Sequence, residues 1–280
     1  MKVSFPHPIF ITRLFVLWLF IGTSNQLYAA GELLISPTRV VFEERTRTAT
    51  LSLVNAGDEN TTYRIGFVQR RMAEDGSFSD IKTPRAGEHF ADRMIRFSPR
   101  QVTLKPGQAQ VVRLMLRKPP KLADGEYRSH LLFRAIPKAE TTSLSRQNAN
   151  EGAISIQLTP IMGISVPIIV RHGKRDVTAS IEQLRFYKDT SNVLFEIHRK
   201  GNNSLYGNIT VSFINPKGES IILKKINGLA VYTPNEKRRF NVPFIAPAGI
   251  ELNMGHLLVQ YHAHADAGGR LISENKIALP

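Results

Sequence analysis

His262, His264 and Asp266 are the residues whose types and spacing come nearest to a metal site. Alternate residues of a β-strand point to the same face, so this spacing would place three candidate ligands together, with His256 nearby as a fourth. The same spacing would also arise from polar residues on the solvated side of a strand whose intervening alanines face inward. The sequence leaves both interpretations open, and equilibrium dialysis against Zn²⁺ distinguishes them.

Other arrangements for catalysis are missing from the sequence. It has no serine in a nucleophile elbow, no phosphate-cradling glycine loop and no cysteine, which removes thiol nucleophiles and thiolate metal sites. Several acidic residues fall in predicted turns or at strand ends, where solvated charge is the ordinary explanation: Glu43, Glu44, Glu74, Asp75 and Glu88. General acid and base catalysis needs carboxyl groups in a buried, paired setting. We therefore expect neither enzymatic activity nor a cofactor.

The first 30 residues have the pattern of a secretory signal peptide. Lys2 and Arg13 are their only charges, residues 14–21 form a short apolar run, and the segment ends in Ala29 and Ala30. The apolar run is too short to span a bilayer, and no later segment is apolar enough to do so. We expect cleavage near residue 30 and an exported chain without an integral membrane segment.

The exported chain would be strongly basic. Without Lys2 and Arg13 it has 35 basic and 23 acidic residues, a formal charge of +12. Export, and the absence of stacking aromatics at regular spacing between the basic residues, argue against nucleic acid as a partner. A cationic surface can instead attract acidic partners. Because the sequence has no cysteine, packing and not disulfides must stabilise the exported chain.

Short alternating runs separated by turn residues predict an all-β protein. The first series of strands is expected at 33–42, 48–54, 63–71, 93–97, 110–116, 129–136 and 154–170. A second series is expected at 177–186, 192–198, 208–214, 219–223, 238–244, 257–263 and 271–279. Seven strands are the number of an immunoglobulin-like sandwich. We therefore expect one such domain at 31–173 and a second, smaller β-sandwich at 174–280.

The strand expected at 154–170 is unusually long. One of its faces is apolar throughout, with Ile154, Ile156, Leu158, Pro160, Met162, Ile164, Val166, Ile168 and Val170. Fully extended it would reach roughly 55 Å, whereas a domain of about 100 residues is only some 35 Å across. Its prolines confine it to a sheet edge or a partly unpaired position. A long apolar edge strand favours pairing with another chain.

Several motifs of the first domain resemble those of the PapD-like periplasmic pilus chaperones. The central motifs are RFSPR at 96–100, LKPG at 104–107 and VRL at 112–114. Supporting motifs are PTRVVF at 37–42, GEYRSHLLF at 125–133 and the strand end at 163–171. Together they make the resemblance specific over residues 31–172, whereas the second domain agrees only in its number of strands.

The resemblance implies two immunoglobulin-like domains in a boomerang arrangement and a role in the chaperone-usher pathway. Such chaperones lend the last strand of their first domain to a pilus subunit that lacks one. The expected partners are pilus or fimbrial subunits and an outer-membrane usher, in the periplasm of a Gram-negative bacterium, with self-dimerisation of the unloaded chaperone left open. The donor side chains implied for this chain are Ile154, Ile156, Leu158, Pro160 and Met162. The later apolar residues of the same strand are expected in the domain's own core.

Arg39 matches the first-strand arginine with which this family grips the terminal carboxylate of the subunit. An arginine fork can bind a carboxylate through two hydrogen bonds, and a solvated arginine at a strand end is the alternative. The second cation of the family is a lysine of the seventh strand, where this chain has Pro167. The second charge is left open among Arg128, Arg134 and Arg171, or the anchor is single. The family's interdomain glutamate, just before Ile136, is replaced by Ala135.

A rival interpretation makes the chain a pilin-like or adhesive structural subunit of a surface fibre, with the long strand used in its own assembly. Against it, the first domain has all seven expected strands, and no short donor extension precedes the first of them. A structural subunit should form long polymers, whereas a chaperone should stay monomeric or dimeric. The size of the purified chain therefore separates the two interpretations.

Overall fold

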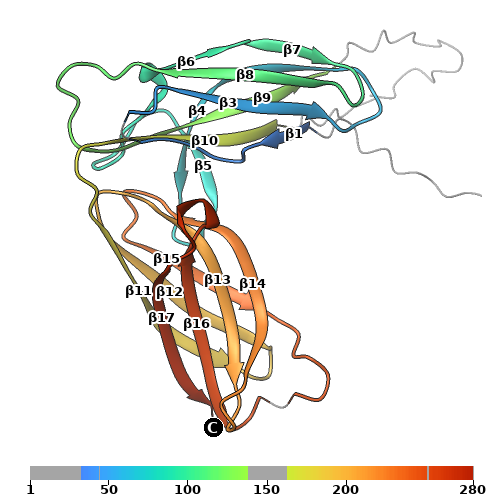
Figure 1. The fold of residues 1–280 in the computed structure, drawn as a ribbon, viewed down its shortest axis with the longest axis vertical. Helices are drawn as coiled ribbons and strands as arrows, with labels where there is room; N and C mark the ends of the chain where they lie inside the picture. The colour runs from blue at the N-terminus through green and yellow to red at the C-terminus, as the bar shows by residue number, and fades with distance from the viewer. Residues whose placement is uncertain (1–32, 44, 138–162, 251, 280) are drawn as a thin grey trace, which may run out of the picture.

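Two β-sandwiches joined at one end give the molecule a bent shape (Figure 1). The computed structural model describes residues 33–43, 45–137, 163–250 and 252–279. In these ranges the regular structure is seventeen strands and two short 3₁₀ helices. The predicted all-β class with two sandwiches in a boomerang arrangement is confirmed. In the described part of the chain, no helix has the length and hydropathy needed to cross a membrane.

The first sandwich contains two antiparallel sheets that face one another. One sheet has the order β1 (Leu33–Ser36), β3 (Thr48–Asn55), β8 (Ala109–Leu116) and β6 (Ile95–Ser98). The other has the order β2 (Val40–Phe42), β10 (Gly163–His172), β9 (Gly125–Ile136), β4 (Thr61–Met72) and β5 (Phe78–Ile81). Strand β7 (Gln101–Leu104) also pairs with β4, and the 3₁₀ helix η1 (Asp92–Met94) precedes β6. Among the described strands of this sandwich, only β2 breaks the antiparallel pattern, because it runs parallel to β10.

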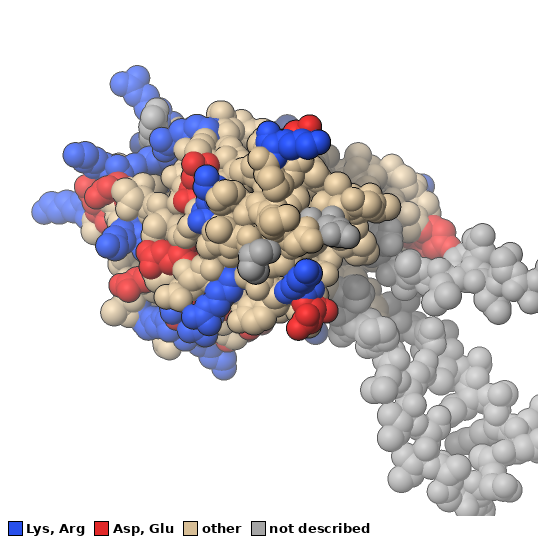
Figure 2. Space-filling view, turned by 90° about the horizontal axis from the view of Figure 1, so that it is seen from below, with Lys and Arg blue, Asp and Glu red and all other residues tan. Residues whose placement is uncertain are grey.

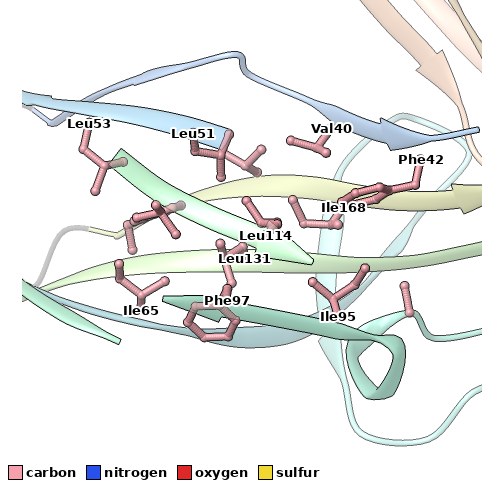
Figure 3. Close-up of a cluster of buried hydrophobic side chains, with 14 of the residues drawn as sticks. Val40, Phe42, Leu51, Leu53, Ile65, Ile95, Phe97, Leu114, Leu131 and Ile168 are labelled. Carbon is pink, nitrogen blue, oxygen red and sulfur yellow. The ribbon is translucent and has the colours of Figure 1, made fainter. Parts of the chain in front are cut away.

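Period-two alternation builds the core between these sheets. In β8, Val112 and Leu114 are buried while Arg113 and Met115 between and beyond them are exposed. Side chains from both sheets meet in the same way around Phe42, Leu51, Leu131 and Ile168 (Figure 3). Burial of each such side chain contributes about 1.5 to 3 kcal/mol. A chain without disulfides therefore holds this domain together by packing.

The first expected strand, 33–42, is divided between the two sheets. Strand β1 pairs with β3 in one sheet, and β2 pairs with β10 in the other. The chain crosses from one sheet to the other near Pro37, which has no N–H to donate to a ladder. The expectation of one continuous strand was therefore wrong, and the short strands β5 and β7 were also missed.

The second sandwich has its own core. Its first sheet has the order β11 (Val177–Tyr187), β12 (Asn192–Gly201) and β15 (Lys237–Pro243). Its second sheet has the order β14 (Ser220–Val231), β13 (Leu205–Ile214), β16 (Gly255–Ala263) and β17 (Leu271–Leu279), and the 3₁₀ helix η2 (Ala265–Ala267) joins the last two. Phe195, Phe213 and Tyr261 are buried between the sheets. At the far end of this sandwich, basic and acidic side chains are interspersed and not segregated by sign (Figure 2).

The tip of the β4–β5 hairpin is docked on the second sandwich (Figure 1). The Arg239 amide donates to the Glu74 carbonyl at 2.7 Å, and the Arg239 guanidinium lies 2.8 Å from the Glu74 carboxylate. Asn235 donates its side-chain amide to the Met72 carbonyl at 2.8 Å. A small apolar cluster of Met72, Ile169, Ala230 and Tyr232 lies beside these contacts. The hairpin thus ties the first sandwich to the second at a point remote from the chain connection.

Candidate functional site

One face of the sheet β2-β10-β9-β4 looks toward the second sandwich instead of into its own core. The residues that alternate with the core positions of these strands line a pocket of about 260 Å³ between the two domains. Its main lining side chains are Arg39, Arg70, His130, Ser165, Tyr206 and Tyr232. Four of them come from four different strands or strand ends of the first sandwich, and the two tyrosines come from the second. The pocket exists only because the two domains meet.

Arg39 lies in this pocket with two nitrogens unpaired. Its Nε and Nη1 atoms are buried and make no hydrogen bond to the residues that the structure describes. Its Cζ atom lies 4.3 Å from the ring centroid of Tyr206 and 5.8 Å from that of Tyr232, so cation–π attraction holds the guanidinium in place. Buried donors without partners cost free energy, and a buried charge costs more. The arrangement therefore favours an anionic hydrogen-bond acceptor beside this guanidinium.

Arg70 projects into the same pocket from β4. Its Nη1 atom donates to Ser165 Oγ at 2.7 Å, and its Nε atom donates to Asp80 Oδ1 at 3.0 Å. The side chain is 28% exposed, and Asp80 is mostly exposed on β5. Sequence reasoning did not select Arg70. The signal that could have found it is its position on β4, two residues after Val68. Val68 pairs with His130 of the neighbouring strand β9, so Arg70 lies on the same face of the sheet close to His130.

His130 is the third nitrogen-bearing side chain of the pocket. It is buried, and its Nδ1 atom has no hydrogen-bond partner in the described part of the chain. Burial lowers the pKa of His130, and the neighbouring charges of Arg128 and Arg70 lower it further, to about 3. The imidazole is therefore neutral at physiological pH, and it adds hydrogen-bonding capacity to the pocket without adding charge.

The three residues expected as alternatives for a second cation lie elsewhere. Arg128 is buried against the Tyr232 ring at 4.2 Å and donates to the Thr233 carbonyl at 3.2 Å, so it serves the domain interface. Arg171 forms ion pairs at that interface. Arg134 is exposed on β9, where it pairs with Gly163 at the far end of the strand. None of the three lines the pocket with Arg39.

A buried glutamate joins the domains, at a position that the sequence did not indicate. The Glu126 side chain is fully buried, and its Oε2 atom lies 3.1 Å from Arg171 Nε and accepts the Ser204 amide at 3.0 Å. The Ser204 hydroxyl donates to Oε1, and Arg171 also pairs with Glu43. Burial alone would raise the pKa of Glu126, but the Arg171 charge and the Ser204 hydrogen bonds bring it below its usual range. Ala135 therefore does not leave the interface without a glutamate, because β9 supplies one nine residues earlier.

Strand β10 has an open edge next to the pocket. Residues 163–167 pair with β9 on one side, whereas β2 pairs with β10 only at 168–170 on the other. Within the described strands, no neighbour uses the second side of residues 163–167. Val166, Ile168 and Val170 are buried in the core as expected, but Ile164 is 41% exposed, so its expected place in the core was wrong. The predicted donor residues, Ile154 to Met162, lie outside the described residues.

The histidine group at the end of β16 has an ordinary structural explanation. His264 Nδ1 accepts the Asp266 amide at 3.4 Å at the start of η2, and it lies 3.1 Å from the Asp266 carboxylate. His264 also packs on the Tyr206 ring, with centroids 4.9 Å apart. Over the described ranges, no cluster of three or more His, Cys, Asp or Glu residues is placed to hold a metal ion.

Comparison with known proteins gives a match to one family model. Residues 32–163 match the N-terminal domain of PapD, described as a pili and flagellar-assembly chaperone. A search of curated proteins found no match. Among solved structures, the chain is similar to the Pseudomonas aeruginosa chaperone CupB2, with 14% identity over 88% of this chain and 100% of that one and a TM-score of 0.42. It is also similar to the E. coli chaperone DraB, with 15% identity over 89% and 97% and a TM-score of 0.40.

The family match covers Arg39, Arg70 and His130 of the pocket and the strands β2 and β9 that pair with β10, and it ends at the first residue of β10. The motifs at 96–100 and 104–107 lie within it. On this match, the resemblance of the first sandwich to the PapD-like pilus chaperones is confirmed.

Proposed function

We propose that this chaperone binds pilus subunits in the periplasm by taking their terminal carboxylate into the interdomain pocket and pairing a subunit strand with the edge of β10. The observation that carries the proposal is the state of Arg39. Arg39 is half-buried, and its two buried nitrogens without a partner among the described residues are costly unless a ligand completes them. A chain terminus supplies an anion with two oxygens and can enter a narrow pocket without a large side chain.

The open edge of β10 supports the second part of the proposal. An unpaired run of backbone N–H and C=O groups is a template for an added strand, and side chains of alternate residues give such pairing its specificity. The residues proposed as donors precede β10 in the sequence: Ile154, Ile156, Leu158, Pro160 and Met162. Each large donor side chain buried in a subunit groove would contribute about 1.5 to 3 kcal/mol, less the cost of ordering the strand.

The remaining steps of this proposal follow from the family and the sequence. The hypothesis also includes delivery of the subunit to an outer-membrane usher and self-dimerisation of the unloaded protein. It further includes cleavage near residue 30 and domain limits at 31–173 and 174–280. Mass measurement of the exported protein tests the cleavage site, and its molecular weight in solution tests the dimer. A structural fibre subunit is not favoured, because the matched family is one of chaperones; long polymers of the purified chain would revive that alternative.

Replacement of Arg39 by alanine tests the anchor. The chaperone is co-expressed with each pilin-like protein encoded beside its gene, and the complex is recovered through a tag on the chaperone. We expect the Arg39→Ala variant to bind the subunit on the order of 30-fold more weakly or worse, since the loss of one partner of a buried charge pair costs at least about 2 kcal/mol.

The matched control is Arg113→Ala, which removes an exposed arginine from β8 in the opposite sheet. It should retain the subunit at the level of the unchanged protein. Thermal unfolding of both variants shows whether the domains stay folded. A folded Arg39→Ala chaperone that still captures its subunit at full strength would refute the proposed anchor.

A further inference from the structure

We propose that Arg70 is the second cation of the carboxylate site, acting beside Arg39 on the same bound chain terminus. This inference rests on the proposed function and deepens it. Both guanidinium groups line one pocket of about 260 Å³, although they come from opposite ends of the sheet, Arg39 before β2 and Arg70 in β4. None of the residues expected to supply a second charge does so.

The fork of Arg70 is oriented but not saturated. Ser165 takes a hydrogen bond from Nη1 at 2.7 Å and Asp80 takes one from Nε at 3.0 Å. The remaining nitrogen, Nη2, makes no hydrogen bond to any described residue. Two fixed contacts restrict the rotamers of a long side chain, so less conformational freedom is lost when a ligand binds. Arg70 is thus held with one donor available.

The number of hydrogen-bond acceptors on a carboxylate favours a site in which two arginines donate to it. A carboxylate has two oxygens with about four lone-pair positions. Arg39 offers two buried nitrogens and Arg70 offers one, which together can serve both oxygens. Arg128 and Arg171 do not line the pocket: Arg128 donates to backbone carbonyls, and Arg171 pairs with two carboxylates at the domain interface. His130 is neutral and can donate or accept a hydrogen bond, but it cannot supply charge.

The contact to Ser165 links this cation to the binding edge. Ser165 belongs to the part of β10 that, among the described strands, pairs only with β9 and leaves its other side open. Arg70 therefore reaches across β9 to the strand on which a subunit would pair. The side chain that holds the terminus and the strand that extends the sheet are connected by one hydrogen bond, and we expect Ser165→Ala to loosen Arg70 and weaken capture less than loss of Arg70 itself.

The experiment compares arginines of the same strand. Arg70→Gln, Arg70→Lys and the control Arg64→Gln are each co-expressed with the subunit that the unchanged chaperone captures. Arg64 is exposed, lies on β4 and faces the same side as Arg70, six residues away. We expect Arg70→Gln to weaken binding roughly tenfold or more, the loss associated with a hydrogen bond to a charged group. Arg70→Lys should recover part of the loss, and Arg64→Gln should bind normally.

A second measurement identifies the group that Arg70 contacts. The purified variants are titrated with a synthetic peptide of the subunit's C-terminal strand, made once as the free acid and once as the C-terminal amide. For the unchanged protein the acid should bind more tightly than the amide, and Arg70→Gln should reduce this difference. Equal losses for acid and amide would show that Arg70 contacts another part of the peptide, and would overturn the inference.

Failure of the inference can be told from failure of the proposed function. If Arg39→Ala loses the subunit while Arg70→Gln keeps it, the anchor is single and only the inference fails. If both variants keep the subunit, the carboxylate site itself is refuted. If both lose it and the double variant loses little more than either alone, the two arginines act on one ligand, because sites that share a partner are not additive.

Discussion

Replacing Glu126 by alanine will destabilise the chain by about 3 kcal/mol and uncouple the two domains. Removal of one member of a buried ion pair typically costs about 3 to 5 kcal/mol, because the other charge is left buried. Arg171 keeps its contact with Glu43, so we expect the lower end of that range. Ser204 would also lose the acceptor for its amide and hydroxyl. Chemical denaturation should show a lower midpoint, and scattering in solution should show a wider spread of domain orientations.

The control for this experiment is Glu43→Ala. Glu43 also pairs with Arg171, but it is about one third exposed and water screens it. Exposed pairs contribute about 0 to 1 kcal/mol. If Glu43→Ala lowers the free energy of unfolding as much as Glu126→Ala does, burial does not determine how much an ion pair with Arg171 stabilises the protein. The explanation given for the interface would then be wrong.

Acidification from pH 6.5 to pH 5 will destabilise the first sandwich by up to about 2 kcal/mol through His130 alone. The pKa of His130 is about 3 in the folded protein, against an ordinary value of 6.5. Between these two values the unfolded chain binds a proton that the folded chain does not. Stability from this residue is therefore complete above pH 6.5 and is lost as the pH falls toward 3.

The chosen pH range isolates His130 from the acidic residues. Glu88, Glu126 and Glu196 have pKa values below their ordinary 4.5, so they are mostly ionised in both states at pH 5 and contribute chiefly in stronger acid. The measurement is the free energy of unfolding against pH for the unchanged protein, His130→Gln and the control His256→Gln, which replaces an exposed residue of β16. His130→Gln should flatten the curve between pH 6.5 and 5. An unchanged slope would place the protonation elsewhere.

The sequence predicted the sandwiches well because their cores depend on local alternation. Val112 and Leu114 face inward because period two places them on one side of a strand that the surrounding turns already define. Val166, Ile168 and Val170 followed the same rule, whereas Ile164, next to the first residue of β10, is exposed. Alternation alone does not show how far along a strand the core extends.

The pocket was less accessible to sequence reasoning because its members are distant in the chain. Arg39 was found through a motif, but its missing partners and its aromatic contacts depend on Tyr206 and Tyr232 from the second sandwich. Arg70 resembles any arginine on a strand until the sheet order places it near Ser165, 95 residues later. Glu126 likewise becomes an interface residue only when Ser204 packs against it, 78 residues away.

The parallel pairing of β2 with β10 also affects the register in which a subunit strand would pair with β10. Val40 pairs with Ile168, so the preceding residue, Arg39, is level with the end of the open β10 edge. A chain terminus held at Arg39 would thus fix the position of the added strand, and so determine which of its residues pairs with each residue of 163–167. Because a slip of one residue turns each side chain to the opposite face, the anchored terminus would set the register of the added strand. Adding one residue to the C-terminus of the subunit would then exchange the side chains that its strand presents to the two faces of the sheet.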